Sequence, residues 1–563
     1  MKLVVIGGVA GGATAAARAR RLSEDAEIVV FERGEYISFA NCGLPYYIGE
    51  VIKDRDNLLV TTADAFNARY HIDIRLFTEV AGIDRKAKKV TVKNHQTGET
   101  YTETYDKIIL SPGAEPVRPP FPGVEADNIF NLRNIPDTDR IKAYVDQHKP
   151  KSAVVVGGGF IGLEMAENLV FRDVQTTIIE KMEQVMPSMD YEMAGLMHAH
   201  LKEKGVGLIL GDGIEAFEKN NGRMIVRTEK GETLECDMAI LSIGVKPENR
   251  LAREAGLEIG DLGGVKVAST MQTSDPNIFA VGDAVEVTDF LTGHATTTPL
   301  AGPANKQGRI AADNVMGRRS IFRGTLGTSV VKIFEQTVAS TGANEKMLRC
   351  YDIPHVASYS HSGSHASYYP GAQMMAVKLL ISPSTGKILG AQIVGGEGVD
   401  KRIDVLATAI HGSMTVFQLE ELELAYAPPF SSAKDPVNIA GFVGANLLKG
   451  DARKINWNEF SALDPEKDVL IDLRNKDELE ETGEIEGALH IPLNELRDNL
   501  HKLDKSKRYI PFCAVGLRGY VAYRILAQQG FDALNLSGGY KTFLGAKEKI
   551  MKESPYTPIW RGE

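Results

Sequence analysis

The sequence predicts an α/β protein of about four structural units, and three observations support this prediction. The chain has 563 residues, and compact domains usually contain roughly 100 to 200. An apolar run, a glycine-rich turn and an alanine-rich segment follow one another twice, starting at Leu3 and at Ala153. From about 326 to 450, strand-like and helix-like stretches alternate without such turns, and a further α/β pattern follows a polar segment. We therefore expect two similar α/β domains and two smaller ones.

The repeat is visible in the letters of the sequence. The first copy, residues 3–21, reads LVVIGGVAGGATAAARARR, and the second, residues 153–169, reads AVVVGGGFIGLEMAENL. Gly7 and Gly157 occupy the same position in the two copies, 150 residues apart. Each copy predicts a buried strand, a tight turn and a helix, which is how a Rossmann-type dinucleotide-binding domain begins.

An acidic residue completes each copy. Glu32 follows a second apolar strand and lies 20 residues after Gly12, and Glu180 lies 18 residues after Gly162. In dinucleotide-binding folds a carboxylate at this distance binds a ribose hydroxyl. One glycine motif alone is weak evidence. Two motifs, each with its strand, helix and carboxylate, favour nucleotide binding over a glycine-rich turn without a ligand.

The two copies differ at the glycine positions. Gly157, Gly159 and Gly162 fill all three positions of the second copy, whereas Val9 stands at the middle position of the first, which has an extra Gly11. A side chain at the middle position pushes a pyrophosphate slightly away, but the amides at the helix N-terminus still attract an anion.

Charge and cysteine content exclude several classes of protein. Lys and Arg number 64 against 74 Asp and Glu, a net charge of −10 that disfavours nucleic acid as a partner. No stretch approaches the roughly 18 apolar residues of a membrane span. The four cysteines form no C-x-x-C pair, which argues against zinc ribbons, dithiol motifs and disulfide scaffolds. We expect a soluble cytoplasmic protein with no metal site.

Three further motifs point to a family. Residues 107–123 and 238–249 read as strands followed by Gly/Pro turns, which suit chain crossovers between two interleaved domains, and an apolar strand ends in Gly282 and Asp283. With the two nucleotide motifs, these segments resemble the pyridine nucleotide-disulfide oxidoreductases over about residues 1–448. The resemblance implies FAD on the first Rossmann unit and NAD(P)H on the second.

The implied fold is two interleaved Rossmann-type dinucleotide-binding domains, an α+β dimerisation domain and a C-terminal α/β rhodanese domain. The expected boundaries are 1–112 and 246–325 for the FAD-binding domain, 113–245 for the NAD(P)H-binding domain, 326–448 for the dimerisation domain and 455–563 for the rhodanese domain.

The resemblance also implies cofactor contacts. Glu32 would bind the FAD ribose, Asp283 would lie near the ribityl chain, and Glu180 would favour the 2′-hydroxyl of NADH. Lys181 follows Glu180, so NADPH stays open. The residues that we expect to contact the two cofactors are Gly7, Ala10, Gly11, Gly12, Glu32, Arg33, Ser111, Gly113, Asp283, Gly157, Gly159, Phe160, Ile161, Gly162, Glu164, Glu180 and Gly244.

The segment SFANCGLPYYIGE, residues 38–50, contains the first candidate redox residue, Cys42. Dithiol members of the family have a second cysteine five positions later, where this chain has Tyr47. A single thiol must instead pass through a species shared with its substrate. The C-G-L-P-Y run resembles coenzyme A-disulfide reductases, which implies a mixed disulfide between Cys42 and CoA that is reduced through the flavin. The alternative is that Cys42 is a small buried apolar residue.

The resemblance further implies a CoA site completed by a second subunit. Thr14, Arg18 and Arg21 share one helical face, where two guanidinium groups can bind phosphates, although a solvated basic stripe has the same pattern. Tyr368 and Tyr426 match tyrosines that face the partner's CoA-bound cysteine, and Tyr369 leaves the register open by one residue. The remaining residues expected to bind CoA are Ser38, Asn41, His294 and Lys434.

The last domain resembles rhodanese, a sulfurtransferase. Its loop begins with Cys513 at a strand end and continues through Ala514, Val515, Gly516, Leu517 and Arg518. Successive backbone amides in such a loop stabilise a thiolate or persulfide. Asp472 and Arg474 match a pair that braces this domain, whereas Cys236 and Cys350 match no functional position. A buried strand-end cysteine is the alternative for Cys513.

These features predict a homodimeric flavoprotein, an oxidoreductase that uses NADH to reduce CoA persulfide, CoA disulfide or polysulfide through Cys42. Cys513 would carry sulfane sulfur, which makes the persulfide a more natural substrate than the disulfide. One alternative is a single-cysteine NADH oxidase or peroxidase that cycles through a sulfenic acid. Another is a protein that senses persulfide through Cys513.

Overall fold

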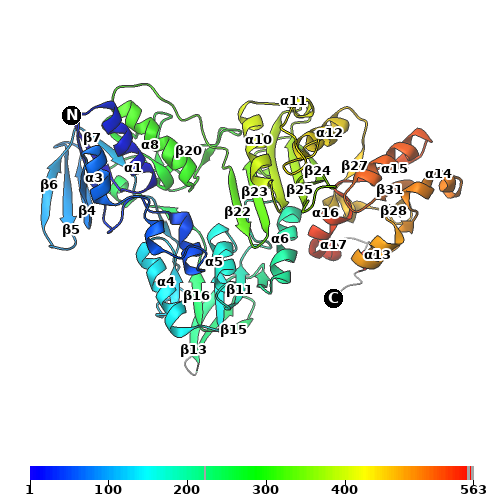
Figure 1. Ribbon diagram of the computed structural model, residues 1–563, viewed down its shortest axis with the longest axis horizontal. Coiled ribbons are helices and arrows are strands. Elements are labelled where there is room, and N and C mark those ends of the chain that lie inside the picture. The colour runs from blue at the N-terminus through cyan, green and yellow to red at the C-terminus, as the bar shows by residue number, and fades with distance from the viewer. Residues whose placement is uncertain (221–222, 554–557, 560–563) are drawn as a thin grey trace. The chain divides into compact units, whose positions relative to one another are not determined.

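The structure is a computed structural model that describes residues 1–220, 223–553 and 558–559. The chain forms two compact units. The first unit comprises Met1–Glu183 and Gly205–Gly327, and the second comprises Gln184–Lys204 and Thr328–Glu563. Figure 1 colours the chain from its N-terminus in blue to its C-terminus in red.

The first sheet of unit 1 is parallel, with the strand order β19-β7-β1-β2-β3. Leu3, Val4 and Val5 are fully buried, as expected of a strand covered on both faces. Helix α1 follows the glycine turn and packs its alanines against this sheet and against α8. The bounds are β1 (Lys2–Ile6), β2 (Glu27–Phe31), β3 (Asp73–Arg75), β7 (Lys107–Leu110), β19 (Ile278–Ala280), α1 (Ala10–Leu22) and α8 (Ala301–Val315).

The second sheet repeats this arrangement, with the order β12-β11-β10-β16-β9 and all strands parallel. The two crossover segments, β8 (Ala114–Pro116) and β17 (Val245–Pro247), pair antiparallel with each other. The chain therefore leaves and re-enters the first domain through adjacent strands. The other bounds are β9 (Ile129–Asn131), β10 (Ser152–Val156), β11 (Gln175–Glu180), β12 (Gly207–Leu210), β16 (Met238–Leu241), α4 (Ile135–His148) and α5 (Phe160–Val170).

Smaller elements complete unit 1. Two three-stranded antiparallel sheets have the orders β4-β5-β6 and β13-β14-β15. The bounds are β4 (Thr78–Asp84), β5 (Lys89–Asn94), β6 (Thr100–Thr104), β13 (Ile214–Asn220), β14 (Arg223–Thr228), β15 (Thr233–Cys236), β18 (Val265–Lys266), β20 (Val285–Thr288), β21 (Ala295–Thr296), α2 (Leu44–Ile48), α3 (Ala63–Tyr70) and α7 (Arg250–Glu254).

Unit 2 is built on a five-stranded antiparallel sheet with the order β22-β23-β26-β25-β24. Helices α6, α10 and α12 pack on this sheet (Figure 1). The bounds are β22 (Ser329–Ile333), β23 (Gln336–Gly342), β24 (Val356–Gly363), β25 (Met374–Ile381), β26 (Ile388–Gly395), α6 (Tyr191–Glu203), α9 (Glu345–Cys350), α10 (Val399–His411), α11 (Val416–Glu421) and α12 (Pro436–Leu448).

A smaller parallel sheet with the order β30-β28-β31-β32 follows in the same unit. Phe460, Phe512 and Phe543 are fully buried in its core. The bounds are β27 (Lys454–Ile455), β28 (Asp468–Asp472), β29 (Glu484–Ile485), β30 (Leu489–His490), β31 (Arg508–Phe512), β32 (Asp532–Ala533), β33 (Asn535–Leu536), β34 (Pro558–Ile559), α13 (Lys476–Thr482), α14 (Leu496–Asn499), α15 (Leu517–Gln528), α16 (Gly539–Gly545) and α17 (Lys547–Glu553).

The position of helix α6 differs from the domain division expected from the sequence, in which residues 113–245 form one nucleotide-binding domain. The helix packs in unit 2 instead, beside α16 (Figure 1). A Cβ atom on Gly195 would lie 1.7 Å from the carbonyl oxygen of Gly545, so the two helices approach as closely as backbones allow. Met193, Met197 and Leu201 are buried on this helix because unit 2 surrounds it.

A buried charge cluster ties α6 to the sheet. The Lys378 ammonium, on β25, forms ion pairs with Asp190, Glu192 and Glu345, and the Tyr359 hydroxyl donates a hydrogen bond of 2.8 Å to Glu192. Burial alone would lower the pKa of Lys378, but the carboxylates, Glu192 first, hold it well above its ordinary value. The three carboxylates lie close enough together to hold a metal ion, but the ammonium already contacts all of them.

Candidate functional site

The two glycine-rich turns of unit 1 have the same geometry. Gly7 has φ +97° and Gly157 has φ +102°, and a Cβ on either would lie within 2.4 Å of the carbonyl oxygen of Ser111 or Ser242. A Cβ on Gly12 or Gly162 would lie 1.9 Å from the carbonyl oxygen of Gly7 or Gly157. Only glycine fits at these positions, because each turn folds back against its own helix.

The two carboxylates close these turns in the same way. Glu32 accepts hydrogen bonds from the Gly8 amide (2.8 Å) and from the Gly34 amide (2.9 Å). Glu180 accepts them from the Gly158 amide (2.7 Å) and from the Met182 amide (2.8 Å). Each carboxylate therefore also fixes the glycine-rich turn that precedes α1 or α5. The sequence alone does not reveal this structural role.

Both turns fit a pyrophosphate. Helices α1 and α5 begin without a side-chain cap and without an acidic residue in the first turn, so their N-terminal amides are left for an anion. A Cβ on Gly159 would meet no atom within 4 Å, and the same holds for Gly113 and Gly244, whose φ angles are positive. This open space in front of uncapped amides is what a dinucleotide requires.

The other predicted cofactor residues surround these turns. Ala10 is the first residue of α1, and Phe160 and Ile161 begin α5. Gly11 packs against Val281 and Ser111. Asp283 lies in a short 3₁₀ turn, where burial raises the pKa of its carboxyl.

Two basic side chains near the turns are already paired. Arg33 forms a bidentate ion pair with Glu248, with N–O distances of 2.8 and 2.9 Å. Lys181 pairs with Glu229 at 2.8 Å and is largely exposed. A 2′-phosphate at this place would therefore meet the Glu180 carboxylate. Lys181 would offset little of the repulsion, because its charge is already paired with Glu229.

Cys42 lies in a 3₁₀ turn that leads into α2, and it is exposed. Desolvation by the surrounding protein raises the pKa of its thiol, and the charges of Glu164 and Asp283 raise it further. Helix α2 packs on α5, and the Tyr46 hydroxyl donates a hydrogen bond of 3.1 Å to Glu164. Burial raises the pKa of Glu164 to about 7.

No second thiol accompanies Cys42 in this segment. Tyr47 is half-buried, and the Lys142 ammonium lies 5.6 Å from its ring centre. All four cysteines are free; Cys350 is exposed, and burial raises the pKa of Cys236 to about 12. The geometry therefore presents one accessible thiol beside a glutamate that titrates near neutrality.

The predicted CoA residues of α1 do not all face solvent. Thr14 donates a hydrogen bond of 2.5 Å to Asn305, and Arg18 forms an ion pair of 2.8 Å with Asp313, so both hold α1 against α8. Arg21 is exposed. Arg20, which the sequence analysis did not single out, is buried and donates to four backbone carbonyls.

Three other predicted CoA residues of unit 1 lie on loops. Ser38 has a left-handed backbone with φ +46°, and Asn41 is exposed next to Cys42. His294 is exposed in the turn between β20 and β21. Ser38 and Asn41 therefore flank Cys42 in sequence, whereas His294 comes from a separate loop.

In unit 2 the fold brings Tyr368 and Tyr426 together, with their hydroxyl oxygens 2.6 Å apart. Both rings are exposed, Tyr368 by 73% and Tyr426 by 47%. The neighbouring Tyr369 packs edge-on against His365 instead. Of the adjacent Tyr368 and Tyr369, it is therefore Tyr368 that contacts Tyr426.

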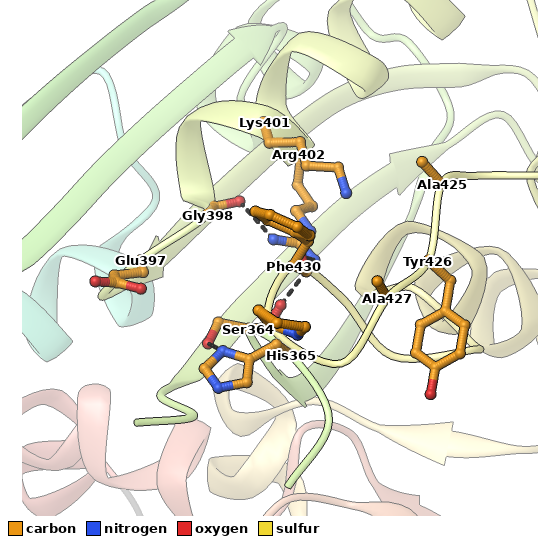
Figure 2. Close-up of a pocket in the computed structure, with 11 residues that line it drawn as sticks. Ser364, His365, Glu397, Gly398, Lys401, Arg402, Ala425, Tyr426, Ala427 and Phe430 are labelled. Carbon is orange, nitrogen blue, oxygen red and sulfur yellow. Dashed lines mark hydrogen bonds between the residues drawn. The ribbon is translucent and has the colours of Figure 1, made fainter. Parts of the chain in front are cut away.

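Tyr426 also borders a cavity of about 600 Å³ (Figure 2). Lys401 and Phe430 line it, and the buried Arg402 closes its base by donating hydrogen bonds to Asp435 and to the Ser364 carbonyl. Arg402 was not predicted from the sequence, because its side-chain partner Asp435 lies 33 residues away. Lys434, next to Asp435, is exposed.

The Cys513 loop follows β31. The Gly516 amide donates a hydrogen bond of 3.2 Å to the Cys513 sulfur, which is fully buried. A Cβ on Gly539 would lie 2.4 Å from the Cys513 carbonyl oxygen, so the turn before α16 supports the loop directly. Leu517 is 70% exposed at the start of α15.

Two ion pairs flank this loop. Arg474 is buried against Asp472 (2.6 Å), donates to the Gly483 carbonyl and lies over the Tyr540 ring at 4.1 Å. Arg518 forms a bidentate pair with Glu478, with distances of 2.6 and 2.7 Å. The sequence analysis did not predict Glu478, because its partner lies 40 residues away on another helix.

One negative finding concerns membranes. Among the residues that the structure describes, no helix has the length and apolar character that a membrane crossing requires.

Family models match three consecutive regions of the chain. The pyridine nucleotide-disulphide oxidoreductase model matches residues 1–308, its dimerisation-domain model matches residues 328–436, and the rhodanese-like domain model matches residues 457–546.

Curated relatives have similar sequences over the first four-fifths of the chain. The coenzyme A disulfide reductase of Staphylococcus haemolyticus is 38% identical over 447 residues, which are 79% of this chain and 100% of the relative. The protein of the same name from Staphylococcus aureus strain JH9 is 37% identical over 442 residues, 78% of this chain and 99% of the relative.

Solved structures extend the similarity to the last domain. Reduced CoADR-RHD of Bacillus anthracis has a TM-score of 0.95 at 50% identity, covering 99% of both chains. A NAD-dependent persulfide reductase from A. fulgidus has a TM-score of 0.91 at 38% identity, covering 96% of this chain and 100% of the other. The water-forming NADH oxidase of Lactobacillus brevis, at 26% identity and a TM-score of 0.76, covers 80% of this chain and 99% of the other.

The predicted fold class and the predicted use of FAD and a pyridine nucleotide are confirmed by these matches. The chain belongs to the pyridine nucleotide-disulphide oxidoreductase family and is a flavin-dependent oxidoreductase that also carries a rhodanese domain.

Proposed function

We propose that the protein uses NADH to reduce CoA persulfide and CoA disulfide through Cys42. The observation that carries this proposal is the exposed single thiol, which has Tyr47 where a dithiol enzyme would have its second cysteine. The partner sulfur must then come from the substrate. The names of the relatives, coenzyme A disulfide reductase and persulfide reductase, support this substrate class.

The chemistry at Cys42 is thiol exchange. Its thiolate attacks the CoA-bearing sulfur of CoA-S-SH, the S–S bond breaks, hydrosulfide leaves with the electron pair, and Cys42 is joined to CoA. With CoA disulfide the leaving group is a CoA thiolate. The disulfide between Cys42 and CoA then breaks, CoA leaves as its thiolate and Cys42 returns to the thiolate, with two electrons that NADH and FAD would supply when bound at the two glycine-rich turns. Glu164, whose pKa is about 7, can hold a proton next to this exchange.

NADH is the proposed electron donor rather than NADPH. Glu180 is fixed by two backbone amides at the position where it receives a 2′-hydroxyl, and a 2′-phosphate there would face its carboxylate. Lys181 offers little compensation, because its charge is paired with Glu229.

We further propose that the protein is a homodimer in which Tyr368 and Tyr426 act on the partner's Cys42 site. The match to a dimerisation-domain model supports the dimer. The exposure of the two hydroxyls and their mutual hydrogen bond support a role with a ligand outside this chain. The hydrogen bond to Tyr426 raises the pKa of Tyr368, so the Tyr368 phenol keeps its proton at neutral pH and can donate a hydrogen bond to a leaving thiolate.

Cys513 is proposed to carry sulfane sulfur as a persulfide. The Gly516 amide already donates to its sulfur, and Arg518 lies close enough for the Cys513 charge to act on it. The amide would stabilise a terminal persulfide anion.

The test is anaerobic oxidation of NADH by the FAD-loaded enzyme with CoA persulfide, with CoA disulfide, and with oxygen or peroxide alone. We expect both CoA substrates to consume NADH, Cys42→Ser to abolish this reaction, and Cys350→Ser, which removes the other exposed thiol, to preserve it. Consumption with oxygen or peroxide only would replace the proposal with the NADH oxidase function, for which the Lactobacillus brevis structure is the precedent.

A further inference from the structure

The Cys513 loop contains few charged side chains. Its side chains at Ala514, Val515 and Leu517 are apolar, and its only charged side chain is Arg518. An arginine beside a reactive thiol can attract an anionic sulfur donor, because its guanidinium binds oxyanions in a bidentate manner. Whether it does so depends on what already binds the guanidinium.

The guanidinium of Arg518 is engaged. Both terminal nitrogens donate to the two carboxylate oxygens of Glu478, at 2.7 and 2.6 Å. Hydrogen bonds from Arg518 lower the pKa of Glu478. The hydrogen bond to Glu478 raises the pKa of Arg518 in turn, and the charge of Cys513 raises it further. Glu478 therefore stays ionised at neutral pH and offsets the positive charge that lies beside Cys513.

The helix that supplies Glu478 adds further negative charge. Helix α13 reads KDELEET, and none of its residues is buried. Asp477 and Glu481 are exposed on it, whereas Lys476 lies 3.9 Å from Glu480. Lys541, whose backbone supports the loop at the Ala514 carbonyl, places its charge near His361 of β24.

We propose that Glu478 makes the Cys513 site selective for an organic persulfide, which carries at most one negative charge on an uncharged arm, and against small sulfur dianions such as thiosulfate. This inference rests on the proposed sulfur-carrier role of Cys513. A dianion that approaches the Cys513 thiolate meets a neutralised arginine and an acidic helix, and like charges brought together in a desolvated site disfavour the encounter. An uncharged arm can instead pack against the apolar loop side chains.

The two loading reactions differ only in the leaving group. With an organic persulfide R-S-SH, the Cys513 thiolate attacks the terminal sulfur, the S–S bond breaks, and R-S⁻ leaves and takes up the proton. With thiosulfate, the thiolate attacks the sulfane sulfur and sulfite leaves with the electron pair of the broken S–S bond. Both leave a Cys513 persulfide anion, so one readout serves both donors.

The experiment measures loading of the full-length FAD enzyme at Cys513, without NADH, as the gain in mass of one sulfur atom. The donors are N-acetylcysteamine persulfide, which has an uncharged arm and at most one negative charge at its terminal sulfur, and the dianion thiosulfate, at low ionic strength. We expect the wild type to load at least about tenfold faster from the organic persulfide. Added salt should speed the thiosulfate reaction more than the persulfide reaction, because it screens like-charge repulsion.

Glu478→Gln is the decisive variant. Glutamine at this position still closes the N-terminal capping box of α13 with Asn475, so the helix is retained while the charge is lost. We expect loading from thiosulfate to rise about tenfold and loading from the organic persulfide to rise no more than about threefold. Glu480→Gln is the matched control, because Glu480 lies two positions along the same helix and therefore on a different face.

Equal loading of the wild type by the two donors would overturn the proposal, as would a thiosulfate rate that Glu478→Gln leaves unchanged. Absence of loading from any donor would instead refute the sulfur-carrier role itself. NADH oxidation with CoA persulfide, followed in parallel, reports on Cys42, so failure of the proposed reductase function is seen separately.

Discussion

In the candidate redox site, the charge of Glu164 acts on the Cys42 thiol. Burial raises the pKa of both groups, and the Glu164 charge adds to the effect on the thiol. Because Glu164 titrates near pH 7, it is protonated in part when the thiol must become a thiolate. The carboxyl proton thus masks a charge that would otherwise oppose formation of the nucleophile.

Glu164→Gln is expected to lower the pKa of Cys42 by about half a unit or more, because it removes a nearby negative charge. The measurement is the rate of iodoacetamide alkylation of the NADH-reduced enzyme between pH 6 and 10, with peptide mass analysis at Cys42. Glu50→Gln is the control, since Glu50 is exposed and pairs with Lys142. An unchanged alkylation profile in Glu164→Gln would show that the two groups are not coupled.

The same residue predicts a pH dependence of stability. Its pKa is about 7 in the folded state against about 4.3 in an unfolded chain. Between these values the folded state holds a proton that the unfolded state releases, so stability falls as the pH rises through this window. The free energy of unfolding of the wild type, measured by denaturant titration, should therefore decline between about pH 4.5 and 7 more steeply than that of Glu164→Gln. Parallel pH profiles would contradict the assignment.

At the scale of elements, the Lys378 cluster joins α6, α9, β24 and β25 through one buried ammonium. Replacing Lys378 by methionine keeps much of the side-chain volume but leaves three buried carboxylates without their cation. Because breaking a buried charge cluster at one partner is strongly destabilising, we expect a loss of at least about 3 kcal/mol. Thermal or denaturant unfolding measures this loss.

Lys332→Met is the matched control for that prediction. Lys332 lies on β22 of the same sheet but is exposed, so its replacement should change the free energy of unfolding by no more than about 0.5 kcal/mol. Equal effects of the two replacements would show that the cluster contributes nothing specific to α6 or to the sheet.

The elements also show how far a sequence can predict a structure. Strand, turn and helix of both Rossmann units follow from local patterns, and the Gly/Pro turns after residues 107 and 238 predicted the crossover strands β8 and β17. The docking of α6 on α16 was not predictable, because Gly195 and Gly545 are far apart in sequence and carry no local signal. Arg18 shows the same limit: its pairing with Asp313 depends on where α8 lies.

At the candidate sites the same distinction holds. Cys42, Cys513 and the two tyrosines could be proposed from the sequence because each stands in a motif or matches one, and their roles stay predictions. Glu478 and Arg402 were not predicted, because their ion-pair partners lie 40 and 33 residues away. Such ion pairs depend on tertiary contacts rather than on periodicity.

At the scale of the whole molecule, the proposed active site requires two chains. We expect the variant Cys42→Ser and the double variant Tyr368→Phe, Tyr426→Phe each to lose at least about 100-fold in CoA-persulfide reduction. In a mixed dimer, one chain supplies Cys42 and the other supplies the tyrosines, so one of the two sites is complete. Refolding the two variants together at equal amounts should restore about one quarter of the wild-type rate, because half of the dimers are mixed.

Restoration would be seen as NADH consumption that appears only after the two variants are mixed. The control is a mixture of Cys42→Ser with Cys42→Ser plus both phenylalanines, which leaves no intact thiol in any dimer. If the first mixture also stays inactive while gel filtration shows exchanged dimers, the tyrosines act within their own chain.

The different exposure of the two functional cysteines has a consequence for survival of the protein under oxidants. Cys42 is open to solvent, whereas the Cys513 sulfur is fully buried beneath its loop. Peroxide oxidises accessible thiols first, so Cys42 and the exposed Cys350 are oxidised before Cys513. Under the roles proposed above, an oxidised enzyme would stop reducing CoA persulfide before it lost the sulfur carried at Cys513, and loaded Cys513 would mark the molecules that had been inactivated.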